Sequence, residues 1–189
     1  MDFRFSDDFL KALEYSVHEA MRTGWRNIGP DHIMLGILRH YNNDACHALY
    51  VLGIDTVQFK EGIDAALFAD DGVPWSELDS IFPNESAVSM LQHSALEAAR
   101  CKDTELCPLH FLLACIRSEG SYSHSWLSSY GVSLKAVVEA AGIKWENYGL
   151  AAQPEETSNT SFVVDAEAFA EAMEKRIREG YTTDNTLAS

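Results

Sequence analysis

The chain contains two copies of one segment, which align without a gap when residue 110 is placed on residue 32, a shift of 78 positions. Identical residues then coincide in a constant register over about 40 positions. Such a repeat constrains the fold strongly, because each copy has to be one supersecondary unit that buries its apolar face against its neighbour. The coinciding pairs are Leu13/Leu91, Ser16/Ser94, Glu19/Glu97, Ala20/Ala98, Arg22/Arg100, Pro30/Pro108, His32/His110, Leu35/Leu113, Arg39/Arg117, Leu49/Leu127 and Gly53/Gly131.

Each copy is predicted to form four helices, because apolar residues recur at steps of three and four positions. No stretch shows sustained alternation of apolar and polar residues, so we predict no strands. The expected fold class is therefore all-α, with the two four-helix repeats packed as a pseudo-twofold bundle. The expected helices span about 7–23, 31–40, 44–52 and 56–67 in the first copy, and 84–100, 108–117, 121–130 and 133–141 in the second.

Six repeated residues are interpreted as structural. Proline is favoured in the first turn of a helix, and glycine is favoured just after the last one. The two histidines each follow the proline by two positions, and we expect them to hydrogen-bond to the preceding loop rather than to act in catalysis. These six residues are Pro30, His32, Gly53, Pro108, His110 and Gly131.

The charge and composition exclude several classes of partner and cofactor. The formal net charge is −15, and so acidic a surface repels nucleic acids and anionic membranes. The N-terminus has no secretory signal, and no apolar stretch is long enough to span a bilayer, so a cytoplasmic protein with reduced cysteines is expected. The cysteine and histidine spacings match no common zinc pattern, and we predict neither a metal nor another cofactor.

The chain is predicted to divide into a helical module and a flexible tail. The module covers 1–144, with repeat one at about 3–69 and repeat two at about 82–143. Residues 145–189 form an acidic linker and tail in which 165–179 has one apolar stripe and could form a short helix. That segment either docks on the module, where it could compete with clients, or remains a tether; the sequence leaves both open.

The first copy resembles the repeat found in the N-terminal domain of the Clp chaperones. The resemblance rests on Phe5-Ser6, on the stretch IGPDHIMLGIL at 28–38, and on Leu49 to Asp55, which is similar to the family pattern L-x-x-L-G-[VI]-D. It covers about 3–143, and the second copy is more divergent. The family carries two such repeats in tandem.

The resemblance implies a peptide- and adaptor-binding module rather than an enzyme. Expected partners are a Clp-type AAA+ ATPase, its substrates or its adaptors. The chain itself has no G-x-x-x-x-G-K-[ST] motif with which to hold nucleotide phosphates. Two alternatives remain open: a structural accessory subunit of a Clp assembly, and a dedicated binder of one helix of a secretion-sheath protein.

Six residues are candidates for contact with a partner. In family members that recognise phosphoarginine, the acid before the repeated histidine helps to bind the guanidinium group; here Asp31 retains an acid in the first copy and Leu109 replaces it in the second. Helix capping or a helix-dipole role is the favoured interpretation of Asp31. Aromatic side chains near helix ends provide the remaining candidates. The candidates are Phe5, Trp25, Asp31, Tyr41, Tyr50 and Trp126.

Overall fold

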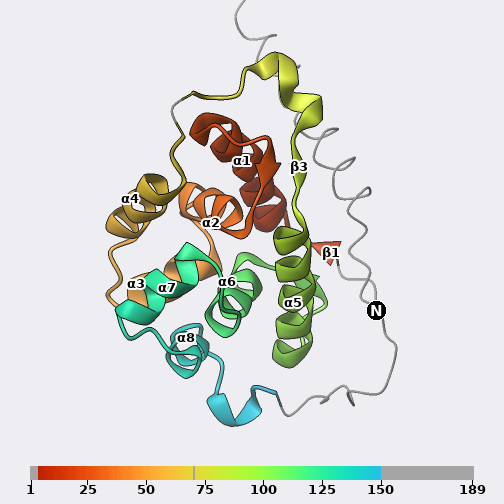
Figure 1. Ribbon diagram of the computed structural model, residues 1–189. Coiled ribbons are helices and arrows are strands. Elements are labelled where there is room, and N and C mark those ends of the chain that lie inside the picture. The colour runs from red at the N-terminus through yellow and green to blue at the C-terminus, as the bar shows by residue number, and fades with distance from the viewer. Residues whose placement is uncertain (1–3, 70, 150–189) are drawn as a thin grey trace, which may run out of the picture.

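Eight α-helices form the described part of the protein, a computed structural model covering residues 4–69 and 71–149 (Figure 1). The predicted segment 165–179 lies outside the described residues. Repeat one holds α1 (Asp7–Thr23), α2 (Pro30–Arg39), α3 (Asp44–Val51) and α4 (Thr56–Leu67); repeat two holds α5 (Glu85–Cys101), α6 (Pro108–Arg117), α7 (Tyr122–Ser129) and α8 (Leu134–Ala140). Two short 3-10 helices, η1 (Trp75–Ser80) and η2 (Trp145–Asn147), follow the repeats. The all-α prediction is confirmed.

Side-chain and glycine caps explain where the helices begin and end. The Ser6 hydroxyl accepts the Phe9 N–H at the start of α1, and Asn84 does the same for Ala87 at the start of α5. At the C-terminus of α1, Gly24 adopts φ 90°, a left-handed conformation that glycine takes without strain. Lys102 occupies the corresponding position after α5 with φ 67°, so the second repeat tolerates strain that the first avoids.

The prediction of no strands was wrong in detail. Four two-residue strands form two parallel pairs: β1 (Arg4–Phe5) with β4 (Glu105–Leu106), and β2 (Asn27–Ile28) with β3 (Phe82–Pro83). Two residues are too few to show an alternating pattern in a sequence. Each pair joins one repeat to the other, and the shift of 78 positions converts one pair into the other, as a pseudo-twofold relation requires.

The core lies around α2 and α6, which occupy the middle of the molecule (Figure 1). Both helices are apolar on most sides, which suits a central position. Each repeat also buries one glutamate of its first helix against two arginines. Glu19 accepts from Arg22 and Arg39, and in the second repeat the equivalent Glu97 accepts from Arg100 and Arg117. A buried carboxylate needs such partners to remain ionised.

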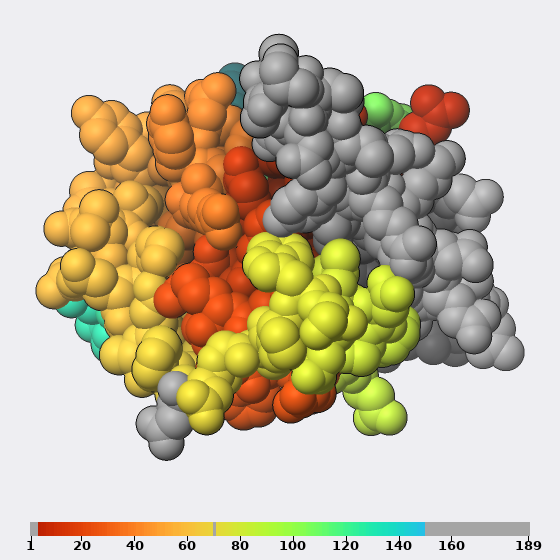
Figure 2. Space-filling model, turned by 90° about the horizontal axis from the view of Figure 1, so that it is seen from above, coloured from red at the N-terminus to blue at the C-terminus, as the bar shows by residue number. Residues whose placement is uncertain are grey.

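The connector between the repeats passes over the C-terminal end of α1. Ala69 N–H donates to Thr23 O at 2.9 Å and Val73 N–H donates to Met21 O at 2.8 Å. Seen from above, η1 (yellow to yellow-green) covers part of α1 (red) (Figure 2). These contacts fix the connector against repeat one.

Candidate functional site

The six candidate residues do not gather at one place. Phe5 is partly buried and packs its ring edge-on against Phe9, with centroids 5.7 Å apart. Trp126 is stacked between Phe59 at 4.4 Å and Tyr130 at 4.1 Å, which places it in the contact between α4 and α7. Both side chains therefore contribute to packing.

The other three aromatic candidates are more exposed. Tyr41 and Tyr50 each leave 79% of their surface accessible, and Trp25 leaves 40%. The Trp25 indole N–H donates to Leu67 O at 2.6 Å, so its ring is fixed against the end of α4. Tyr41 and Tyr50 are the candidates with the most surface available to a partner.

Asp31 binds the start of α7 in the other repeat. Its carboxylate accepts the Tyr122 N–H at 3.0 Å, the Ser123 N–H at 2.8 Å and the Ser123 hydroxyl at 2.6 Å. Asp44 makes the reciprocal contact, accepting the Leu109 N–H of α6 at 2.9 Å. The shift of 78 positions relates the two contacts, because it places Asp31 on Leu109 and Asp44 on Tyr122, so that α2 meets α7 as α6 meets α3. The acids differ in position, and both satisfy N–H groups that a helix leaves free.

Replacing Asp31 with Ala is expected to lower the free energy of unfolding by about 1–2 kcal/mol, because the first N–H groups of α7 lose a charged acceptor. Urea denaturation followed by circular dichroism measures this loss. Asp55→Ala is the matched control, since Asp55 caps α4 within one repeat. A distinguishing readout is the Ser123 amide resonance, which should move in Asp31→Ala and stay in place in Asp55→Ala. An Asp31→Ala protein as stable as the wild type would contradict the capping role.

His32 and His110 close the loops that precede α2 and α6. The Nδ1 atom of His32 accepts the Gly29 N–H at 2.9 Å, and that of His110 accepts the Cys107 N–H at 3.0 Å. Burial lowers the pKa of His32 to about 4 and also lowers the pKa of His110, so both rings are neutral at pH 7. In each neutral ring Nε2 therefore carries the proton.

Cys101, Asp103 and His110 bring three potential metal ligands within 4.8 Å of one another. His110 Nε2 carries the proton and donates it to Asp103 at 3.0 Å, so it has no lone pair to offer a cation. Burial also raises the pKa of the Cys101 thiol to about 12, whereas metal binding requires the thiolate. The cluster fits a hydrogen-bonded loop better than a metal site.

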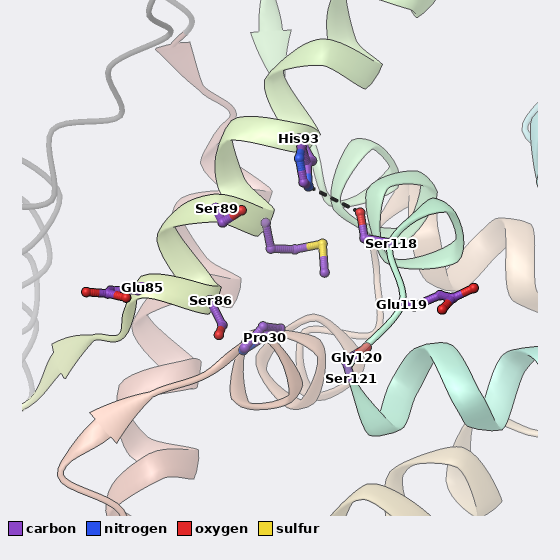
Figure 3. A pocket seen from close by; sticks show the side chains of 10 residues that line it. Pro30, Glu85, Ser86, Ser89, His93, Ser118, Glu119, Gly120 and Ser121 are labelled. Carbon is purple, nitrogen blue, oxygen red and sulfur yellow. Dashed lines mark hydrogen bonds between the residues drawn. The ribbon is translucent and has the colours of Figure 1, made fainter.

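A pocket of about 330 Å³ opens between the first turns of α5, the start of α2 and the loop between α6 and α7 (Figure 3). Pro30 and Met90 provide its apolar surface. Serine hydroxyls line it from two sides, at Ser86 and Ser89 on α5 and at Ser118 in the loop. Its volume is at the lower end of the range for ligand pockets, about 300–1,000 Å³.

At the equivalent position the first repeat carries larger side chains. Lys11 and Tyr15 stand where the second repeat has Ser89 and His93. The Lys11 ammonium lies 4.9 Å from the centroid of the Tyr15 ring, and the Arg39 guanidinium lies 4.5 Å from it on the same surface. The lining of the pocket therefore differs from the equivalent surface of repeat one. Its residues form no known motif.

His93 and Ser118 face each other in the pocket, with Nδ1 and Oγ 3.2 Å apart (Figure 3). A hydrolase would also need a carboxylate to orient the imidazole and donors for the oxyanion. No hydrogen bond is found to His93 Nε2 within the part of the chain that the structure describes. Among residues 4–69 and 71–149, the pair therefore has no third group of the kind that a catalytic triad requires.

Comparison with known proteins identifies the family. The protein-family model of the Clp repeat N-terminal domain matches residues 4–144. The chain belongs to the Clp N-terminal domain family. Domains of this family are protein-interaction modules.

Two curated relatives are full-length Clp proteins. The chaperone protein ClpB of Oceanobacillus iheyensis is 29% identical over 162 residues, which is 84% of this chain and 20% of ClpB. The negative regulator of genetic competence ClpC/MecB of Bacillus subtilis is 28% identical over 131 residues, which is 69% of this chain and 16% of that protein. The chain thus spans no more than a fifth of these relatives.

Two solved N-terminal domains share the fold. The domain of ClpV from Vibrio cholerae has a TM-score of 0.56 and 17% identity, covering 77% of this chain and 95% of that domain. The domain of ClpD from Arabidopsis thaliana has a TM-score of 0.54 and 15% identity, and the match covers 73% of this chain and 94% of that domain. Within 4–69 and 71–149, no helix is long and apolar enough to cross a membrane.

Proposed function

We propose that this Clp N-domain is a non-catalytic recognition unit that binds segments of client or adaptor proteins for a Clp-type AAA+ unfoldase. The observation that carries the proposal is the family match over residues 4–144, which is nearly all of the described part. A unit of this kind can work as a separate subunit or as the first domain of a longer chain.

The surface of the domain supports protein recognition. Tyr41 and Tyr50 are large aromatic side chains that remain largely exposed, and tyrosine is frequent among residues that anchor protein interfaces. The formal charge of −15 favours cationic or amphipathic partners over nucleic acids.

The test combines the purified chain with a Clp-type ATPase from the same organism and an unfolded client such as casein. We expect saturable binding of the client or the ATPase by calorimetry, a changed rate of client unfolding, and no ATP hydrolysis by the chain alone. The double variant Tyr41→Ser with Tyr50→Ser should weaken binding about tenfold, because it removes two exposed aromatic anchors.

The control is Val57→Ser, which changes another exposed apolar side chain outside the candidate set. It should bind as the wild type does. Binding to neither the client nor the ATPase would overturn the proposal. ATPase stimulation without client binding would favour the structural accessory subunit.

A further inference from the structure

The pocket of repeat two has the electrostatics of a cation site. Of the ten described residues that line it, two carry carboxylates, Glu85 and Glu119, and none is lysine or arginine. Both carboxylates stand at the edges of the pocket and point outward (Figure 3). From there they create a negative potential over the opening without filling it.

Helix N-termini at the pocket could instead have attracted an anion, since their free N–H groups carry partial positive charge. Several of the N–H groups concerned already have partners. Asp31 accepts those of Tyr122 and Ser123 on α7, and Asn84 accepts that of Ala87 on α5. The first residue of α2 is Pro30, which has no N–H. An anion would therefore meet the Glu85 and Glu119 carboxylates, while the donors named here are already occupied.

The arrangement of acceptors favours an ammonium group over a guanidinium group. A guanidinium binds best to a carboxylate that faces it in one plane, and the two carboxylates here face away from the cavity (Figure 3). The oxygens within the pocket are separate hydroxyls on α5 and on the loop after α6. The three N–H bonds of an ammonium diverge, so they can each reach a different hydroxyl. Ser118 can donate to His93 and still accept from a ligand.

We propose that this pocket binds a lysine side chain of a partner protein, with the aliphatic stem against Met90 and Pro30 and the ammonium among the serine hydroxyls. The proposal rests on the proposed function, since a lysine subsite is useful only to a module that binds proteins. Lysine combines the apolar stem and the compact charge that the lining requires. The first repeat has Lys11 at the position equivalent to Ser89, where Glu14 holds its ammonium at 3.1 Å.

The test is a nuclear magnetic resonance titration of the full chain with N-acetyl-lysine methylamide. We expect saturable shifts of the Met90 methyl group and the Ser89 amide in the millimolar range. The norleucine analogue, which keeps the stem without the ammonium, and inorganic phosphate should leave both signals unchanged. The arginine analogue should bind several-fold more weakly than the lysine analogue. Equal or tighter binding of arginine, a phosphate-induced shift, or no lysine response would each overturn the proposal.

Two variants show whether the shifts come from this pocket. Ser89→Lys places a tethered ammonium at the pocket and should abolish the response to free lysine. Lys11→Ser alters the equivalent position of repeat one and should leave the response intact. Melting temperatures of both variants confirm that they are folded. A response that survives in folded Ser89→Lys would place the lysine elsewhere. Binding of casein without a lysine response would disprove this subsite and leave the proposed function standing.

Discussion

Replacing Gly36 with Ala is expected to lower the free energy of unfolding by about 3 kcal/mol. Gly36 lies where α2 crosses α1, and a Cβ atom there would come within 2.1 Å of Ala12 O and 2.9 Å of Ser16 N. Both are backbone atoms, so the clash cannot be relieved by a side-chain rotation and the helices have to separate. Overpacking a core costs about 1–3 kcal/mol, and a backbone clash belongs at the upper end. Urea denaturation measures the change.

Gly62→Ala is the matched control for the effect of Gly36→Ala on the crossing of α1 and α2. A Cβ atom at Gly62 would meet the Tyr122 hydroxyl at 2.9 Å and the Trp126 ring at 3.2 Å, which are side-chain atoms that can move. Alanine also favours the helix by about 1 kcal/mol over glycine, so the net loss should stay below about 1 kcal/mol. If Gly36→Ala unfolds at the same urea concentration as Gly62→Ala, the two helices do not cross as closely as described.

The sequence predicts the helices well because their determinants are local. Ser6, Gly24, Asn43 and Asp55 cap helices where their side-chain chemistry favours a helix end. The apolar stripe of Phe9 and its neighbours then sets which face is buried. The repeat also predicts the arrangement of the two halves, since a contact made within one copy is expected within the other.

The contacts between the repeats could not be predicted from those signals. Asp31 and Asp44 have ordinary first-turn positions in their own helices, and nothing local shows that each caps a helix of the other repeat. The paired strands are equally invisible, because two residues carry no periodicity. These features depend on the relative placement of segments about 65–92 residues apart.

The candidate aromatic residues show that a place near a helix end does not predict whether a side chain is exposed. Tyr50 and Trp126 were selected by the same reasoning, as aromatics near helix ends, yet Tyr50 is 79% exposed and Trp126 is stacked between two rings. Which of them is free depends on the contact between α4 and α7. The pocket of repeat two was missed for the opposite reason. It is a space between side chains, and sequence patterns record which side chains are present rather than what they leave empty.

Replacing Phe111 with Ala is expected to cost about 4 kcal/mol of unfolding free energy. Phe111 of α6 is fully buried and its ring centroid lies 6.0 Å from that of Phe9 on α1, so the pair joins the cores of the two repeats. Truncating a buried phenylalanine costs about 3–5 kcal/mol, because apolar contact is lost and a cavity remains. The positions equivalent to Phe9 and Phe111 hold the smaller Ala87 and Ile33, so they provide no second ring pair to replace the lost contact.

The exposed Phe82 provides the control, because Phe82→Ala removes the same ring from a position that is 53% accessible and should change stability by less than about 0.5 kcal/mol. A double-mutant cycle then isolates the contact between the repeats. Phe9→Ala and Phe111→Ala should together cost less than the sum of the single changes, by about 0.5–1.5 kcal/mol, because each single variant already breaks the same ring pair. Strictly additive losses would mean that the two rings stabilise their own repeats separately. Coupling of the predicted size would show that the repeats are held together through this pair, as well as through the strands and the reciprocal helix caps.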